Sequence, residues 1–193
     1  MNRDFQKFGW PLDGKYGEVN IRIDSTGQWY HEDSLIRRIE LVRLFATLLK
    51  KDKKGDYWLE TPAEKILIQV EDVPFIAIAM NVENRGKNQS LTFEPNVGDI
   101  FKAGANNPIR IKTNIVNLQP SPYVIVRDNL EAKITRSVFY DMVNLGIKLD
   151  GIYGIWSNGV FFPLDNVENS NWDDQRQIFL PTQKFGMVNT EIK

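Results

Sequence analysis

The first regular pattern of apolar and polar residues covers positions 18–24, where every second residue is aliphatic. A period of two predicts a strand with one buried face. Ser25-Thr26-Gly27 then favours a turn. From Asp33 or Ser34, either of which can cap a helix, to about Lys51, apolar residues recur at helical spacing. The pattern therefore predicts a strand followed by a helix.

Strands dominate the stretch after this helix. Residues 57–59 and 65–71 predict a hairpin, residues 75–82 an apolar strand, and residues 91–93 a shorter one. Residues 96–108 hold two glycines and three asparagines, a composition typical of a loop. We expect the subdomain boundary there, with an N-terminal α+β subdomain at 1–95 and a C-terminal one at 96–193, packed through a cleft.

The second half repeats the order of the first. Residues 109–116 alternate again, 123–128 form a short strand that ends in aspartate, and 132–148 have helical spacing. A hairpin around the Ser157-Asn158-Gly159 turn follows. An offset of about 98 residues places Arg136 on Arg38, and self-similarity of this kind indicates one unit used twice. We therefore expect an internally duplicated α+β fold of strand, helix and hairpin units with antiparallel sheets.

The two aligned arginines lie at unusual helical positions. At about 100° per residue, Val42, Phe45 and Leu49 fall within about 40° of Arg38. The second helix places Tyr140, Val143 and Ile147 around Arg136 in the same way. Each arginine is therefore predicted at the centre of a buried apolar stripe.

A buried guanidinium needs a negative partner, because arginine cannot lose its proton in a protein. One interpretation is an internal ion pair with Asp24, Asp128 or the Glu71-Asp72 pair. The other is that at least one arginine faces a cleft between the halves and binds a phosphate or carboxylate through its planar fork. Both interpretations stay open on the sequence alone.

Composition and charge narrow the classes of function. With 24 basic and 25 acidic residues the net charge is −1, which disfavours binding to a nucleic-acid polymer. There are no cysteines, no signal-peptide core and no stretch of about 20 apolar residues, so we expect a cytoplasmic protein without membrane binding. His31 is the one histidine, and no nucleotide-loop, hydrolase or metal motif is present. We expect no cofactor and no metal, and binding rather than catalysis.

Several motifs together resemble a known bacterial family. They are Gly27-Gln28-Trp29-Tyr30-His31, Tyr57-Trp58-Leu59-Glu60-Thr61-Pro62, Val70-Glu71-Asp72-Val73-Pro74-Phe75 and Ile134-Thr135-Arg136-Ser137-Val138-Phe139-Tyr140. This combination resembles domain of unknown function 1285 over nearly the whole chain. The resemblance implies a duplicated core, a C-terminal half superficially like a pleckstrin-homology domain, a binding site between the halves, a nucleotide-based ligand and a role in signal transduction.

Three hypotheses follow from these observations. The first is a regulatory protein that binds a small anionic, nucleotide-like ligand between its halves. The second is a protein-interaction module that docks a signalling partner, and the third is an enzyme that uses His31 with the Glu71-Asp72 pair. The residues that we expect in the ligand cleft are Arg38, Arg136, His31, Thr61, Glu64, Glu71, Asp72, Tyr140, Trp156 and Ser157.

Overall fold

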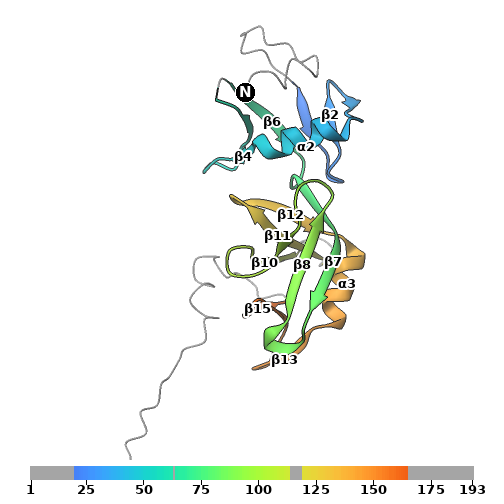
Figure 1. The fold of residues 1–193 in the computed structure, drawn as a ribbon, viewed down its shortest axis with the longest axis vertical. Coiled ribbons are helices and arrows are strands. Elements are labelled where there is room, and N and C mark those ends of the chain that lie inside the picture. The colour runs from blue at the N-terminus through green and yellow to red at the C-terminus, as the bar shows by residue number, and fades with distance from the viewer. Residues whose placement is uncertain (1–19, 63, 114–118, 165–193) are drawn as a thin grey trace, which may run out of the picture.

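The computed structural model describes residues 20–62, 64–113 and 119–164, which form two lobes (Figure 1). We call residues 20–73 the N-lobe and residues 74–164 the C-lobe, because the strands of each stretch share sheets. The described part is mostly β, with two α-helices, and the predicted α+β class is confirmed at this level. None of its helices has the length and apolar character needed to span a membrane.

The N-lobe is one six-stranded sheet covered by helix α2 (Ile39–Leu48). The strand order is β3-β2-β1-β6-β5-β4, and β1 and β6 form its parallel pair. Val42, Phe45 and Ala46 are the buried residues of α2, and the Phe45 ring centre lies 5.9 Å from that of Trp29. The strands are β1 (Ile21–Ile23), β2 (Trp29–His31), β3 (Ser34–Leu35), β4 (Leu49–Lys51), β5 (Tyr57–Glu60) and β6 (Lys65–Val70).

The C-lobe has a six-stranded sheet, a three-stranded sheet and helix α3 (Arg136–Asn144). The first sheet has the order β10-β11-β12-β7-β8-β9 with β7 and β12 parallel, and the second is the meander β13-β14-β15. The elements are β7 (Phe75–Glu83), η1 (Gly86–Asn88), β8 (Ser90–Pro95), β9 (Phe101–Lys102), β10 (Ile109–Thr113), β11 (Pro120–Arg127), β12 (Leu130–Ile134), β13 (Ile147–Leu149), β14 (Ile152–Ser157) and β15 (Val160–Pro163).

The first helix is shorter than the sequence pattern predicted. Glu32 and Asp33 have left-handed φ angles of 46° and 62°, and they form the two-residue turn of the β2–β3 hairpin. Ser34 and Leu35 pair with β2, so the helix begins only after Arg38. At the other end, Leu49–Lys51 leave the helix and pair with β5. The expected cap at Asp33 or Ser34 was wrong because those residues belong to a hairpin.

The second helix differs in the same way. We expected it over residues 132–148, but Leu130–Ile134 form β12, which lies between β11 and the parallel strand β7. Asp128 and Asn129, with φ angles of 46° and 61°, supply the preceding two-residue turn. Ala132 and Ile134 are buried by this long-range pairing, which a local pattern does not show.

The observed starts of α2 and α3 also contradict the predicted burial of Arg38 and Arg136. Arg38 is the residue before α2 and Arg136 is the first residue of α3, and both are exposed. Each apolar stripe begins after its arginine, because the preceding residues turn into a hairpin strand instead of continuing the helix. Their predicted place at the centre of a buried stripe was wrong.

The chain changes lobe at residues 71–74, about twenty residues before the boundary that the loop composition suggested. Strands β7 and β8 belong to the C-lobe sheet, and the expected loop at 96–108 contains β9, which pairs with β8. In both lobes a hairpin precedes the helix and a three-stranded antiparallel meander follows it. The meander β4-β5-β6 joins the first sheet through β1, whereas β13-β14-β15 forms a sheet of its own.

The two lobes share one apolar core, and a close backbone approach fixes one edge of their contact. Gly27 has a left-handed φ of 78°, and a Cβ there would lie 2.7 Å from Asn96 Nδ2 and 2.8 Å from Ile76. Asn96 Nδ2 donates to the Gly27 carbonyl at 3.2 Å, and Asn96 Oδ1 accepts from the Ile76 amide at 3.0 Å. Glycine is favoured here, because even a methyl side chain would force Asn96 or Ile76 to move and would strain the left-handed backbone.

Candidate functional site

A group of charged side chains around Tyr123 lies where the C-lobe sheet meets the N-lobe. It combines strands β10, β11 and β12 with the end of β4 and with the segment that joins the lobes. We call it the junction cluster. Its members are Lys51, Asp72, Arg110, Lys112, Tyr123, Glu131 and Lys133.

The alternation of β10 and the pairing register place these side chains on one face. Arg110 lies directly opposite Tyr123, and Tyr123 lies directly opposite Lys133 on the next strand. Successive side chains of a strand point to opposite faces. Ile109, Val124 and Ala132 therefore face the core, while their neighbours form a polar face toward the N-lobe.

A buried ion pair anchors this face. The guanidinium of Arg110 contacts both carboxylate oxygens of Glu131, with 2.5 Å between Nη2 and Oε2. The side chains are only 17% and 8% exposed, so water screens the pair weakly. Arg110 and Lys112 also lie over the Tyr123 ring, each 4.9 Å from its centre.

Asp72 ties the segment between the lobes to the same group. Its carboxylate accepts from the Tyr123 hydroxyl at 3.1 Å and from Lys133 Nζ at 2.8 Å. Burial and the neighbouring Asp72 carboxylate raise the pKa of Tyr123 to about 12, because both disfavour the phenolate. Tyr123 is therefore a neutral donor at physiological pH.

The cluster carries more positive than negative charge. Four cations face two carboxylates, which leaves two positive charges in excess. Glu131 is paired with Arg110, and Asp72 is paired with Lys133. Among the described residues no carboxylate lies within ion-pair distance of Lys112. Partial burial and Arg110 lower the pKa of Lys112, while Glu131 and Asp72 raise it and Lys51 lowers it more weakly. An added anion would favour the charged form of this exposed lysine.

Two further contacts hold the lobes beside this cluster. Arg127 donates to the carbonyls of Ala46 and Leu49 at the C-terminal end of α2, where a cation is favourable. Lys50 pairs with Asp128 at 3.3 Å between exposed side chains. Asp128 is thus engaged with Lys50, and with Arg127 at 3.7 Å.

Asp24, the other aspartate considered as an arginine partner, accepts hydrogen bonds from Thr26, Gln28 and Tyr30 in its own turn.

The residues predicted for the ligand cleft do not converge. Arg38 and Arg136 stand at the starts of helices in different lobes (Figure 1). Glu71 pairs with Arg22 at 2.7 Å in the N-lobe, whereas its neighbour Asp72 faces the C-lobe. Because these adjacent carboxylates face different lobes, Glu71 and Asp72 do not act together on one ligand or ion-pair partner. Asp72 is the one predicted residue that lies in the junction cluster.

The other predicted residues have local roles in the structure. His31 is half-buried at the end of β2. The Thr61 hydroxyl accepts from the Glu64 amide at 2.9 Å and closes the β5–β6 turn. Tyr140 is 57% exposed on α3.

Trp156 packs against β15, and Ser157 connects β14 to β8. The Trp156 ring centre lies 5.3 Å from that of Phe161. Ser157 is fully buried; its hydroxyl accepts from the Leu91 amide at 2.9 Å and donates to the Ala103 carbonyl at 2.8 Å. Both bonds are to the backbone, so this serine joins β14 to the β8–β9 region.

Sequence reasoning missed the basic members of the junction cluster. The available signal was the alternation of Arg110 and Lys112 with isoleucines in β10, a strand with one polar face. That pattern is common on solvent-facing strands. Only the long-range approach of Lys51 and Asp72 distinguishes this face from an ordinary surface. No group of histidine, aspartate and glutamate suited to a metal ion occurs in the described part of the chain.

Comparison with known proteins is consistent with this architecture. Two family models match adjoining parts of the chain: a domain of unknown function (DUF1285), N-terminal domain, at residues 11–73, and a protein of unknown function (DUF1285), C-terminal domain, at residues 74–164. The two models meet between residues 73 and 74, within the segment 71–74 where the chain changes lobe. No curated protein matches the chain.

Two solved structures are similar to this one. A DUF1285 family protein from Silicibacter pomeroyi is 43% identical, with a TM-score of 0.73, over 79% of this chain and 82% of that one. A DUF1285 family protein from Shewanella baltica is 24% identical, with a TM-score of 0.52, over 65% of this chain and 91% of that one, and it supports the fold alone. From both family models and the Silicibacter relative, we conclude that this chain belongs to the DUF1285 family.

Proposed function

We propose that this protein binds a small anionic ligand at the junction cluster, between its two lobes. The observation that carries the proposal is the excess of two positive charges, on Lys51 and Lys112, beside carboxylates that other cations already occupy. A phosphate or carboxylate group fits this excess, because both accept charge-assisted hydrogen bonds from ammonium groups. The ligand would contact both lobes, since Lys51 ends β4 and Lys112 lies on β10.

The finer parts of the proposal come from the sequence. A nucleotide-like ligand and a regulatory role in signal transduction were expected from the family resemblance. Tyr123 is only 5% exposed, so its ring offers no free face to stack on a base. We therefore propose that the cluster recognises the phosphate group of such a ligand. Internal duplication is supported by the shared order of hairpin, helix and meander, and the pleckstrin-like character of the C-lobe stays a prediction.

Calorimetry and thermal-shift measurements on the full chain test the binding. The panel is inorganic phosphate, pyrophosphate, AMP, ATP and citrate. A ligand at a hundred times its Kd stabilises a fold by about 2.7 kcal/mol. That corresponds to a rise in Tm of about 5–10 °C for a protein of this size. A panel in which no compound changes the Tm would refute the proposal.

Three lysine variants locate the site. Lys112→Gln and Lys51→Gln should each weaken binding by about five- to tenfold, because each removes one charge from the excess. Lys65→Gln is the matched control, since Lys65 also lies over an aromatic ring, 4.6 Å from that of Trp58, outside the junction cluster. Equal losses from all three would show a nonspecific effect of net charge. Arg38→Gln and Arg136→Gln test the original expectation, and a loss confined to them would move the site to the helix starts.

A protein-interaction module is the second candidate. Ile78 and Tyr140 are 47% and 57% exposed on β7 and α3, two elements that contact each other. Exposed apolar side chains on neighbouring elements favour a protein contact. Sedimentation of the wild type and of Tyr140→Glu would show whether this surface mediates self-association. Identical monomeric sedimentation would leave self-association without support.

A further inference from the structure

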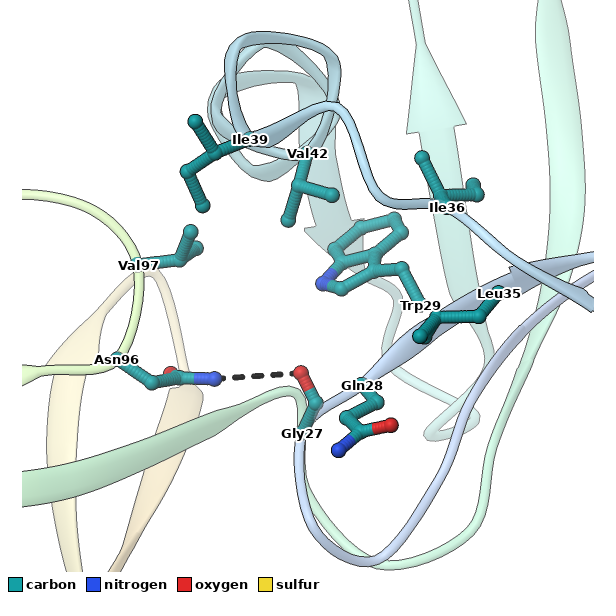
Figure 2. A pocket seen from close by; sticks show the side chains of 9 residues that line it. All are labelled: Gly27, Gln28, Trp29, Leu35, Ile36, Ile39, Val42, Asn96 and Val97. Carbon is teal, nitrogen blue, oxygen red and sulfur yellow. Dashed lines mark hydrogen bonds between the residues drawn. The ribbon is translucent and has the colours of Figure 1, made fainter.

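A small apolar hollow lies on the other side of the contact between the lobes, around Trp29 (Figure 2). Its volume is about 210 Å³, and helix α2, the β2–β3 hairpin and the loop after β8 surround it. The walls are mainly aliphatic and aromatic side chains, among them Ile39, Val42 and Val97. It shares no residue with the junction cluster.

The indole nitrogen of Trp29 is a buried donor without an acceptor. Trp29 is 2% exposed, and its Nε1 forms no hydrogen bond within the described residues. Figure 2 shows this nitrogen facing the space enclosed by Ile39, Val42 and Val97. A buried indole N–H usually has a partner, because an unmade hydrogen bond leaves its desolvation uncompensated. Trp58, by comparison, donates its Nε1–H to Asp52 at 3.1 Å.

Protein groups near the hollow do not satisfy this donor. Asn96 lines the same hollow, and its side-chain amide is one of the polar groups drawn there in Figure 2. Its oxygen already accepts from the Ile76 amide, and its nitrogen donates to Gly27. A buried water at this nitrogen is disfavoured as well, because a stable buried water needs two to four polar partners and the side chains that Figure 2 shows in front of the nitrogen are aliphatic. The ring itself packs against Phe45.

Size and polarity together define the ligand. An apolar cavity of about 150 Å³ holds benzene, so this hollow suits about eight or nine non-hydrogen atoms. One donor without a partner, in a wall that is mainly apolar, matches one acceptor on an otherwise apolar molecule. We propose that this hollow binds a small apolar carbonyl compound whose oxygen accepts the Nε1–H of Trp29. The site is independent of the proposed anion site, and either can fail alone.

A pair of matched probes tests the inference. Acetophenone has nine non-hydrogen atoms and one carbonyl, and α-methylstyrene has the same shape with CH₂ in place of the oxygen. In titrations of ¹⁵N-labelled full chain, acetophenone should shift the Trp29 indole proton downfield and saturate. It should bind about three- to tenfold tighter than α-methylstyrene, the ratio that one hydrogen bond provides. Equal affinities for the two probes, or no saturable shift with either, would overturn the proposal.

Variants separate the donor from the apolar wall. Trp29→Phe identifies the indole signal by its loss and should abolish the preference for acetophenone, because its carbonyl then loses water without gaining a donor. Ile39→Ser should weaken both probes by about fivefold, because it removes apolar surface from the rim. Ile147→Ser is the control, an isoleucine of similar exposure on β13 (43% against 42%) outside the hollow. If Trp29→Phe does not fold, the ratio of the two probe affinities in the wild type and the effects of the two serine variants still test the site. Equal losses of probe affinity in the two serine variants would refute it.

Discussion

Glu131→Gln is the most direct test of how the junction cluster is held together. The substitution keeps the shape of the side chain and removes its charge, which leaves Arg110 facing a neutral amide. Both side chains of the wild-type pair are largely buried, at 17% and 8% exposure. Removing one partner of a buried pair costs about 3–5 kcal/mol, because the remaining charge is desolvated without compensation. We expect about 3 kcal/mol here, since the amide can still accept one hydrogen bond from Arg110.

Urea denaturation followed by circular dichroism measures this loss. For a protein of this size, about 3 kcal/mol lowers the Tm by about 6–12 °C. Glu83→Gln is the matched control: it breaks the Lys102–Glu83 pair, whose side chains are 54% and 52% exposed, and should cost less than about 1 kcal/mol. The double variant Arg110→Met with Glu131→Leu should recover most of the loss, because an apolar pair of similar volume leaves no buried charge. Equal costs for Glu131→Gln and Glu83→Gln would show that burial does not govern this pair.

Three further outcomes follow from the structure. Gly27→Ala should lower the free energy of unfolding by about 2–4 kcal/mol, because left-handed strain and close contact act together. Gly55→Ala, where φ is 96° and the space around the Cβ is open, should lower it by about 1 kcal/mol. Equal losses in the two variants would contradict the close approach at Gly27. Because the pKa of Tyr123 is raised to about 12, the unfolded tyrosine ionises first, and the folded state should lose stability as the pH rises from 10 toward 12. Denaturant titrations at a series of pH values should show a shallower loss in Tyr123→Phe than in the wild type. Identical dependences of stability on pH would contradict the raised pKa of Tyr123. Ser157→Ala leaves the buried amide of Leu91 without its acceptor and should cost about 1–3 kcal/mol by urea unfolding, and a neutral result would show that another group satisfies the amide.

Hairpins and apolar strands were predictable because their signals are local. The β5–β6 and β14–β15 hairpins and strand β7 lie where period-two patterns and turn residues placed them. Both helices were expected near their observed positions, but each was drawn too long at both ends. Glu32-Asp33 and Asp128-Asn129 are two-residue turns with left-handed φ angles, and the helical patterns predicted from Asp33 or Ser34 and from residue 132 included the hairpin strands that follow these turns. That error placed Arg38 and Arg136 on buried stripes.

The candidate sites depend on contacts between residues far apart in the chain. Asp72 meets Tyr123 and Lys133 because the chain crosses between the lobes beside β11 and β12, 51 and 61 positions before its partners. Trp29 faces a hollow whose far wall, Val97, lies in the other lobe. Local periodicity carries no information about such distances. The sequence suggested a contact between the halves and an anion as ligand, but not the residues that form the contact.

By itself, the sequence determined the α+β class, the family, and the positions of most strands and turns, because backbone preferences and side-chain alternation act within a few residues. The tertiary structure alone decided which charges share a face and which donor lies buried without a partner. Those properties arise when β12 inserts beside β7 and Gly27 approaches Asn96. Packing between the lobes turns the polar face of strand β10 into part of the junction cluster and leaves the Trp29 indole nitrogen buried beside the hollow. The sequence does not show this, because the desolvation of a group depends on what packs against it.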